Sequence, residues 1–130
     1  MDRFSFLLVA GGGAIGSVLR FWLSGVVGRR WGESFPYGTL LVNITGCLAI
    51  GFFATLTGPE GRALVRPEWR LAFMTGVCGG YTTFSSFGLQ TLNLGLEGDW
   101  LRAGANIILS VILCLVAVWV GHFCAVALNR

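Results

Sequence analysis

A cluster of glycine, hydroxyl and aromatic residues lies inside an apolar segment that is otherwise long enough to cross a lipid bilayer. The cluster occupies residues 79–87 and reads Gly-Gly-Tyr-Thr-Thr-Phe-Ser-Ser-Phe. In hydrocarbon every backbone amide and carbonyl must be paired, so sequence that weakens a helix at that depth is tolerated only where protein buries it or where it lines a watery pathway. The cluster is therefore the first candidate for the functional site.

Two aromatic side chains of this cluster could do chemistry of their own. Phe84 and Phe87 lie one helical turn apart, and the edge of an aromatic ring carries partial positive charge that can meet an anion. Packing is the more common role for two phenylalanines. Their position beside a polar break instead favours a role in an anion pathway.

Polar residues elsewhere in the apolar segments form two stripes. Thr39 and Asn43 are four residues apart, and so are Asn106 and Ser110, with Cys114 following. Residues at i and i+4 share one face of a helix. Hydrogen bonds between helices account for the presence of Thr39 or Asn106 in an apolar segment as well as a functional role does. The amide of Asn43, stacked over Thr39, favours function.

The sign of the embedded charge separates two classes of substrate. Arg20 lies deep in the first apolar segment, and no Asp or Glu lies inside any of them. A proton-coupled cation exporter needs a membrane carboxylate to bind its substrate and its proton. The charge pattern therefore favours an anion.

The composition indicates a membrane protein of a single domain. Hydrophobic residues make up 55% of the 130 residues and charged residues only 12%, about half the share of charge in a soluble domain. The net charge of +3 is too small and scattered to suggest a nucleic-acid partner. His122 is the only histidine, and no nucleophile with a base is in evidence, so we expect no enzyme activity.

Four apolar segments satisfy the requirement of about 20 residues for a transmembrane helix. We place them at residues 4–27, 37–57, 70–94 and 101–128. The expected fold is an all-α integral membrane domain over residues 1–130, with the third helix broken at the polar cluster. Glycines at G-x-x-x-G spacing, in the first and third segments, predict close helix contacts. These glycines are Gly12 and Gly16, and Gly76 and Gly80.

The arginines at or beyond the ends of the segments give only a weak orientation signal. If the N-terminus, the second link and the C-terminus share one side, that side holds five arginines and the other holds three. The five are Arg3, Arg62, Arg66, Arg70 and Arg130, and the three are Arg29, Arg30 and Arg102. A weak bias under the positive-inside rule permits insertion both ways, and so an antiparallel dimer of identical chains.

Three sequence blocks, at residues 12–21, 38–47 and 76–87, resemble the Fluc (CrcB) family of fluoride channels. The third block is the most specific, because G-G-x-T-T-F-S-x-F within a broken third helix is hard to obtain by chance. The resemblance covers the chain from end to end. It implies an antiparallel, dual-topology homodimer with two fluoride pores, each lined by both subunits.

The resemblance also implies roles for individual residues. Phe84 and Phe87 would be the pore phenylalanines, Asn43 the pore amide, and Thr83 and Ser110 would supply hydroxyls, with Thr39 in the same stripe. Backbone carbonyls of Gly79 and Thr82 would hold a structural sodium ion (Na+) at the dimer centre, where carbonyl dipoles at a helix break suit a small cation. Arg20 would draw anions into the vestibule. Asn106 and Cys114 depart from a track of hydroxyl side chains on the fourth helix.

The expected function is passive export of fluoride across the cell inner membrane. Hydrogen fluoride crosses membranes as a neutral acid and dissociates inside, and an interior-negative potential contributes about 2.3 kcal/mol per charge per 100 mV to the anion's departure. The expected partners are fluoride, a second copy of the chain and lipid. The alternatives are a small four-helix multidrug exporter and a non-transporting membrane protein that serves as an assembly partner.

Overall fold

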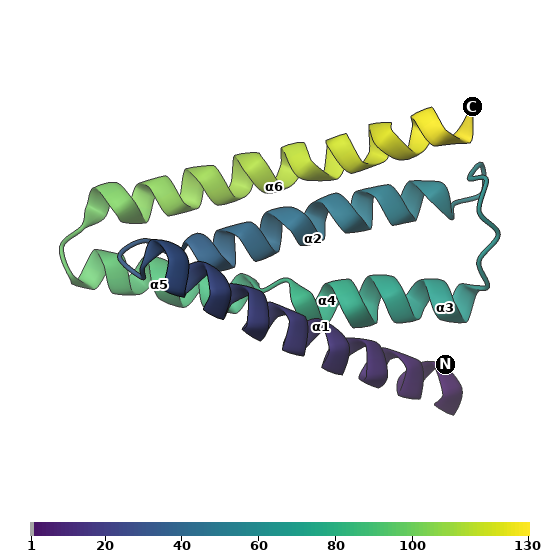
Figure 1. Cartoon of the computed structure of the whole chain (residues 1–130), viewed down its shortest axis with the longest axis horizontal. Helices are drawn as coiled ribbons and strands as arrows, with labels where there is room; N and C mark the ends of the chain where they lie inside the picture. Colours follow the sequence, from purple (N-terminus) through teal and green to yellow (C-terminus); the bar gives the residue numbers. More distant parts are fainter. Residues whose placement is uncertain (1) are drawn as a thin grey trace.

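The computed structural model describes residues 2–130, and it is helical throughout that range apart from short links (Figure 1). The elements are α1 (Arg3–Trp31), α2 (Tyr37–Leu56), α3 (Pro67–Leu71), the π-helical segment η1 (Ala72–Cys78), α4 (Gly79–Tyr81), α5 (Phe84–Leu96) and α6 (Trp100–Asn129). The all-α class predicted from the sequence is confirmed for these residues. Three of the helices, α1, α2 and α6, are long and apolar enough to cross a membrane.

The apolar segment expected at residues 70–94 is not one helix. It is built from α3, η1, α4 and α5, and the helical backbone stops between α4 and α5. The other three segments match the expected positions, although α1 continues to Trp31, beyond the expected end at residue 27. The chain alternates in direction, so both termini and the α2–α3 link lie at one end of the molecule (Figure 1).

Large apolar side chains point outward, and small or polar residues fill the interior. Phe21 is 83% exposed and Leu101 is 85% exposed, whereas Asn106 is only 2% exposed. Lipid is as apolar as leucine, so membrane helices associate through close packing of small residues and through hydrogen bonds rather than by burying large side chains. The distribution of side chains is that of a membrane protein.

Glycines let α1 approach η1 to backbone distance, as the G-x-x-x-G spacing predicts. A Cβ atom on Gly12 would lie 2.6 Å from the carbonyl oxygen of Ala72, and one on Gly16 would overlap the carbonyl oxygen of Val77. Both glycines are buried. At this distance their Cα–H groups can contact the facing carbonyls.

The π-helical form of η1 matches this contact. A π-helix has i→i+5 hydrogen bonds in place of the i→i+4 bonds of an α-helix, and so has wider turns. Gly12 lies against the carbonyl of Ala72 and the amide of Val77, which are five residues apart, and Gly16 lies against the carbonyl of Val77. The two glycines of α1 therefore contact the backbone of the wide turn directly.

Helices α2 and α6 make a second glycine-mediated contact. A Cβ atom on Gly51 would overlap the carbonyl of Val118, and one on Gly121 would overlap the carbonyl of Leu48. Between the same helices, Nδ1 of His122 and the hydroxyl of Thr55 are 2.7 Å apart. His122 is therefore a packed residue that is hydrogen-bonded between the two helices.

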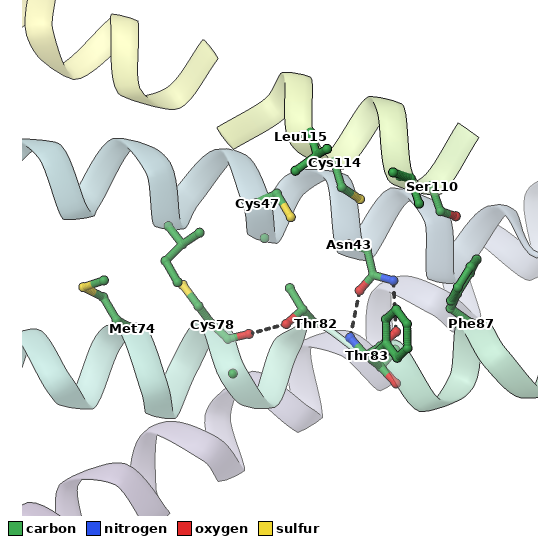
Figure 2. A pocket seen from close by; sticks show the side chains of 15 residues that line it. Asn43, Cys47, Met74, Cys78, Thr82, Thr83, Phe87, Ser110, Cys114 and Leu115 are labelled. Atoms are coloured by element: carbon green, nitrogen blue, oxygen red, sulfur yellow. Dashed lines mark hydrogen bonds between the residues drawn. The ribbon is translucent and has the colours of Figure 1, made fainter. Parts of the chain in front are cut away.

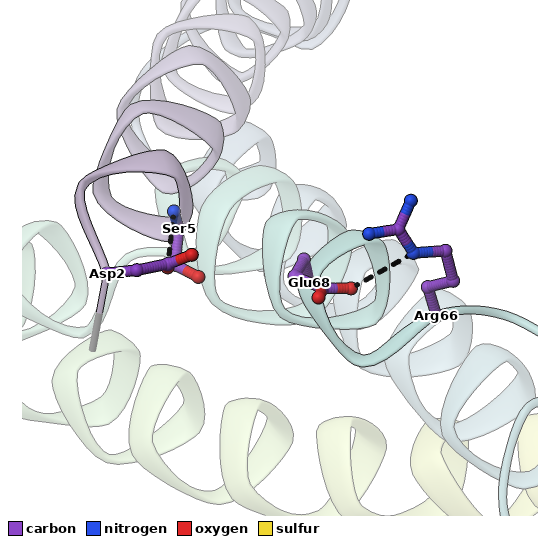
Figure 3. Close-up of polar contacts among 4 residues, drawn as sticks. All are labelled: Asp2, Ser5, Arg66 and Glu68. Carbon is purple, nitrogen blue, oxygen red and sulfur yellow. Dashed lines mark hydrogen bonds and ion pairs between the residues drawn. The ribbon is translucent and has the colours of Figure 1, made fainter.

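Helix α1 begins with a side-chain cap. The Ser5 amide donates a hydrogen bond of 3.0 Å to Oδ1 of Asp2 (Figure 3). Hydrogen bonding from the Ser5 side chain, and next from the Ser5 backbone, lowers the pKa of the Asp2 carboxyl from its ordinary value. An acidic cap at this end is also favoured by the helix dipole.

The link that leads into α3 is held by two arginines. Arg70 donates to the hydroxyl of Thr57 at 2.9 Å and to the carbonyl of Ala54 at 3.2 Å, so it caps the end of α2. Arg66 pairs with Glu68 at 3.5 Å (Figure 3). The Arg66 side chain is 71% exposed, so this ion pair contributes little to stability.

Candidate functional site

The interruption between α4 and α5 is two residues long. Thr82 has φ −78° and ψ 157°, and Thr83 has φ −149° and ψ 113°, so both residues have extended backbones. The hydroxyl of Thr83 accepts a hydrogen bond of 3.1 Å from the amide of Ser86. Thr83 is thereby the N-cap of α5, and the polar cluster supplies the residue that restarts the helix.

Asn43 of α2 bonds both backbone polar groups of Thr83 (Figure 2). Its Nδ2 donates to the Thr83 carbonyl at 3.0 Å, and its Oδ1 accepts from the Thr83 amide at 2.7 Å. In a continuous α-helix that amide would donate to the carbonyl of Gly79. Asn43 therefore satisfies the backbone where the helix is interrupted, and it keeps one N–H and one lone pair for another partner.

Arg20 of α1 contacts the last turn before the interruption. Its Nε donates to the carbonyl of Gly80 at 3.2 Å, and the hydroxyl of Ser17 lies 3.5 Å from the same oxygen. The carbonyls at the end of a helix lack intrahelical partners and carry partial negative charge. Arg20 thus caps the last turn before the interruption, a contact that the sequence did not indicate.

A chain of hydrogen bonds connects α6 with α5. Ser110 donates to Oδ1 of Asn106 at 3.4 Å, and Nδ2 of Asn106 donates to the hydroxyl of Thr91 at 2.9 Å. Thr91 donates in turn to the carbonyl of Phe87 at 2.8 Å. The Asn106 amide therefore joins two helices. Sequence reasoning missed Thr91, although its position four residues after Phe87 placed it on the same helix face.

Most of the expected site residues line one cavity of about 450 Å³ between α2, α6 and the interrupted segment (Figure 2). Its lining includes Asn43, Gly79, Thr82, Thr83, Phe84, Phe87 and Ser110. The Phe84 and Phe87 rings lie 5.4 Å apart between centroids with a tilt of 49°. Phe84 is 82% exposed, so one of the two rings lies at the outer surface of the chain.

Two expected residues lie outside this cavity. Thr39 lines a different cavity of about 530 Å³, near the α1–α2 link, together with Gln90 and Arg102. Arg20 lines neither of the two cavities. The helical spacing of Thr39 and Asn43 predicted that they share one face of α2. It did not predict that the two residues line different cavities.

Backbone carbonyls at the interruption are available as oxygen ligands for a cation, besides the hydroxyls of Thr82 and Thr83. No group of three or more His, Cys, Asp or Glu side chains within residues 2–130 is arranged to hold a metal ion. Gly79 is exposed, and the space where its Cβ would stand is open apart from one carbonyl at 3.9 Å. The amide and hydroxyl of Thr82 both donate to the carbonyl of Cys78, at 2.9 and 3.0 Å.

Comparison with known proteins shows the family. The family model described as "CrcB-like protein, Camphor Resistance (CrcB)" matches residues 7–122. The chain belongs to the CrcB family. The matched CrcB region includes every residue singled out above from Arg20 to Ser110, and the resemblance predicted from the three sequence blocks is confirmed.

Several CrcB relatives are similar over almost their whole length. A protein of Rhodospirillum rubrum is 59% identical over 126 residues, which cover 97% of this chain and 98% of the relative. One of Opitutus terrae is 63% identical over 124 residues, covering 95% and 94%. One of Paramagnetospirillum magneticum is 56% identical over 126 residues, covering 97% and 98%. All three carry the name Fluoride-specific ion channel FluC.

Proposed function

We propose that this chain forms a fluoride-selective channel through which cytoplasmic fluoride leaves the cell passively. Relatives that are 56–63% identical carry the name of a fluoride-specific channel. The observation in the structure that carries the proposal is the interrupted segment, whose Thr83 backbone is bonded by Asn43 beside two phenylalanine rings. The protein is a multi-pass protein of the cell inner membrane and not an enzyme.

The pathway follows the cavity that the interruption opens. Phe84 and Phe87 present ring edges to the anion, and Asn43 offers the N–H that its bonds to Thr83 leave free. The hydroxyls of Thr83 and Ser110 supply further donors along the cavity. Selectivity over chloride rests on the width of the path and on donors close enough to compensate for lost hydration.

The interrupted segment also bears on the number of spans and on the assembly of two copies. The interrupted segment from Pro67 to Leu96 makes the fourth span, since α3, η1, α4 and α5 together traverse the length of the bundle. Phe84 lines the cavity while it is 82% exposed. A second copy in the antiparallel orientation would cover this ring and complete the wall. The dual topology of such a homodimer agrees with the weak arginine bias.

A structural sodium ion would fit at the dimer centre. The Thr83 amide donates to Asn43 and so leaves the carbonyl of Gly79 without its helical partner. Thr82 follows in extended backbone, where its carbonyl also lies outside a helix. Carbonyl oxygens at a helix break are suitable ligands for a small hard cation, and the ion would tie the two interruptions together.

Fluoride efflux from liposomes that contain the purified protein tests the proposal, with chloride efflux recorded in parallel. We expect rapid fluoride release with little chloride. The double variant Phe84→Ile with Phe87→Ile should lose the flux, whereas Phe21→Ile should keep it, because Phe21 is 83% exposed on α1 and does not line the cavity. Absence of fluoride release from folded protein would favour an exporter or an assembly partner.

A further inference from the structure

Sulfur side chains gather at one part of the cavity described above. Cys47, Cys78, Cys114 and Met74 all line it (Figure 2), and the four cysteines of the chain are free thiols. Among the sulfur side chains within residues 2–130, only Cys124 lies outside the cavity, exposed on α6. None of the roles proposed for fluoride permeation uses these sulfur atoms.

Two of the thiols lie opposite each other on neighbouring helices. Cys47 is on α2 and Cys114 on α6, and the register of these helices pairs residues 67 apart, since Thr55 bonds His122 and Gly51 contacts Val118. Cys47 and Cys114 have the same separation, two turns before Thr55 and His122. Figure 2 shows both sulfur atoms directed into the same space. Because Gly51 and Gly121 hold α2 and α6 at backbone contact, the two cysteines are presented by elements that cannot easily separate.

Their position follows from the two polar stripes. Cys47 is four residues after Asn43, and Cys114 is four residues after Ser110. The thiol pair therefore continues the two helix faces that carry the donors of the proposed pathway, one turn farther along. A ligand on the thiols would lie directly beside Asn43 and Ser110.

Thiol ligands select soft metal ions. No third side chain within residues 2–130 is arranged to complete a larger cluster with His, Cys, Asp or Glu, so the pair suits an ion that accepts two ligands in a line. We propose that Cys47 and Cys114 form a two-coordinate site for a divalent thiophilic metal ion, for which Hg2+ is the probe.

Charge balance favours a divalent ion. Binding breaks both S–H bonds, forms two S–Hg bonds and releases two protons to water, so the bis-thiolate complex is neutral. A monovalent ion such as Ag+ would leave one negative charge in an apolar cavity, which is costly. Hg2+ should therefore bind more tightly than Ag+.

Direct binding tests the site without any measurement of fluoride. The Cys124→Ser variant removes the exposed thiol, and intact-mass spectrometry should then show one Hg added and two hydrogens lost per chain. Cys47→Ser and Cys114→Ser in this background should each weaken binding by at least about 100-fold, since even outer partners of metal ligands are worth 10–100-fold. Cys78→Ser should leave binding nearly unchanged, because Cys78 is not a ligand of the proposed pair.

Two results would overturn the site. One is Hg2+ binding that Cys47→Ser and Cys114→Ser both leave unchanged while each variant elutes as the wild type does on gel filtration. The other is binding that disappears with Cys78→Ser, which would move the site within the cavity.

A second measurement rests on the proposed function. Hg2+ should block fluoride efflux in the Cys124→Ser protein, a dithiol should reverse the block, and Cys47→Ser should abolish it. If no variant conducts fluoride at all, the proposed function fails while the binding result still decides the metal site. If fluoride flows and Hg2+ binds without blocking it, the placement of the thiols beside the pathway is wrong.

Discussion

Asn43 illustrates how one side chain can serve both the fold and the proposed pathway. Its amide bonds the carbonyl and the amide of Thr83, and helical spacing predicted only that it shares a stripe with Thr39. The two bonds depend on a break at one exact residue in a distant helix. Sequence spacing within α2 contains no information about that register, so the stripe was predictable and its partner was not.

Removal of the Asn43 amide should affect stability and flux together. Asn43→Ala leaves two buried backbone groups of Thr83 without partners, and we expect a loss of roughly 1–3 kcal/mol in the free energy of unfolding together with loss of fluoride efflux. Asn93→Ala is the matched control, since Asn93 is exposed on α5. Thermal unfolding in detergent and liposome efflux measure the two effects, and unchanged stability of Asn43→Ala would contradict the role of its hydrogen bonds.

Arg20 allows charge to be separated from hydrogen bonding. The sequence suggested a charge that attracts anions, whereas the structure shows Nε bonded to the Gly80 carbonyl. Arg20→Lys keeps the charge and removes that fixed donor. We expect destabilisation of about 1.5–3 kcal/mol, the range for hydrogen bonds to charged groups, measured by thermal unfolding. Arg29→Lys, at an exposed site on α1, should leave the unfolding temperature unchanged. If Arg20→Lys is as stable as the wild type, the hydrogen bond to Gly80 is not the role of Arg20, and only its charge remains as an explanation.

At the scale of elements, the small-residue contact between α1 and η1 was predictable and its geometry was not. Gly12, Gly16, Gly76 and Gly80 indicated a close helix pair, and the structure brings them together. The π-helical turn left no comparable signal. Ala72 and Val77, five residues apart, both lie against Gly12 of the facing helix, and a contact of this kind is a tertiary property that the sequence of η1 alone does not contain.

Gly16→Ala tests this contact. The added Cβ would overlap the Val77 carbonyl and lie 2.7 Å from the Tyr81 amide, and backbone atoms cannot move aside as a flexible side chain can. Overpacking of this kind costs about 1–3 kcal/mol. Gly11→Ala is the control, because nothing lies within 4 Å of its Cβ position. Equal thermal stability of the two variants would show that α1 and η1 are less closely packed than described.

The start of α1 gives a dependence on pH. Hydrogen bonding from the side chain and the backbone of Ser5 lowers the pKa of Asp2 in the folded protein. The cap therefore contributes to stability above the unfolded pKa, and this contribution is lost as the pH falls through the lowered value. We expect a small decrease in the unfolding temperature between about pH 5 and pH 3, given an ordinary Asp pKa of about 3.9. Asp2→Asn keeps a capping side chain and should reduce that decrease; an identical pH profile would exclude Asp2 as its source.

At the scale of the whole molecule, the order and the approximate ends of the apolar segments followed from hydropathy, because a lipid environment imposes length and polarity on each span. Orientation did not follow, since five arginines against three give little bias. The Phe84 ring is exposed in the single chain, and in the proposed homodimer a second copy would cover it. The sequence of one chain gives no direct signal for such a contact.

Labelling of single cysteines tests the proposed dual topology. Leu64 in the α2–α3 link is fully exposed, and Ser34 is exposed in the α1–α2 link at the opposite end of the molecule. In the Cys124→Ser background, Leu64→Cys and Ser34→Cys should each react with a membrane-impermeant maleimide to about half on intact cells, since a weak arginine bias permits both orientations. Complete labelling of one position and none of the other would establish a single orientation.

The π-helical turn in η1 also determines which way the interrupted segment faces. An α-helix advances about 100° per residue, whereas a π-helix spreads each turn over more residues, so η1 holds about one additional residue without turning the chain that follows it. If the same residues from Ala72 to Cys78 formed a regular α-helix, Thr82 and Thr83 would turn by roughly 100°, away from Asn43. Deleting one residue together with that change would leave their direction nearly unaltered. The direction in which the site opens thus depends on the helix type of a segment that lies before it.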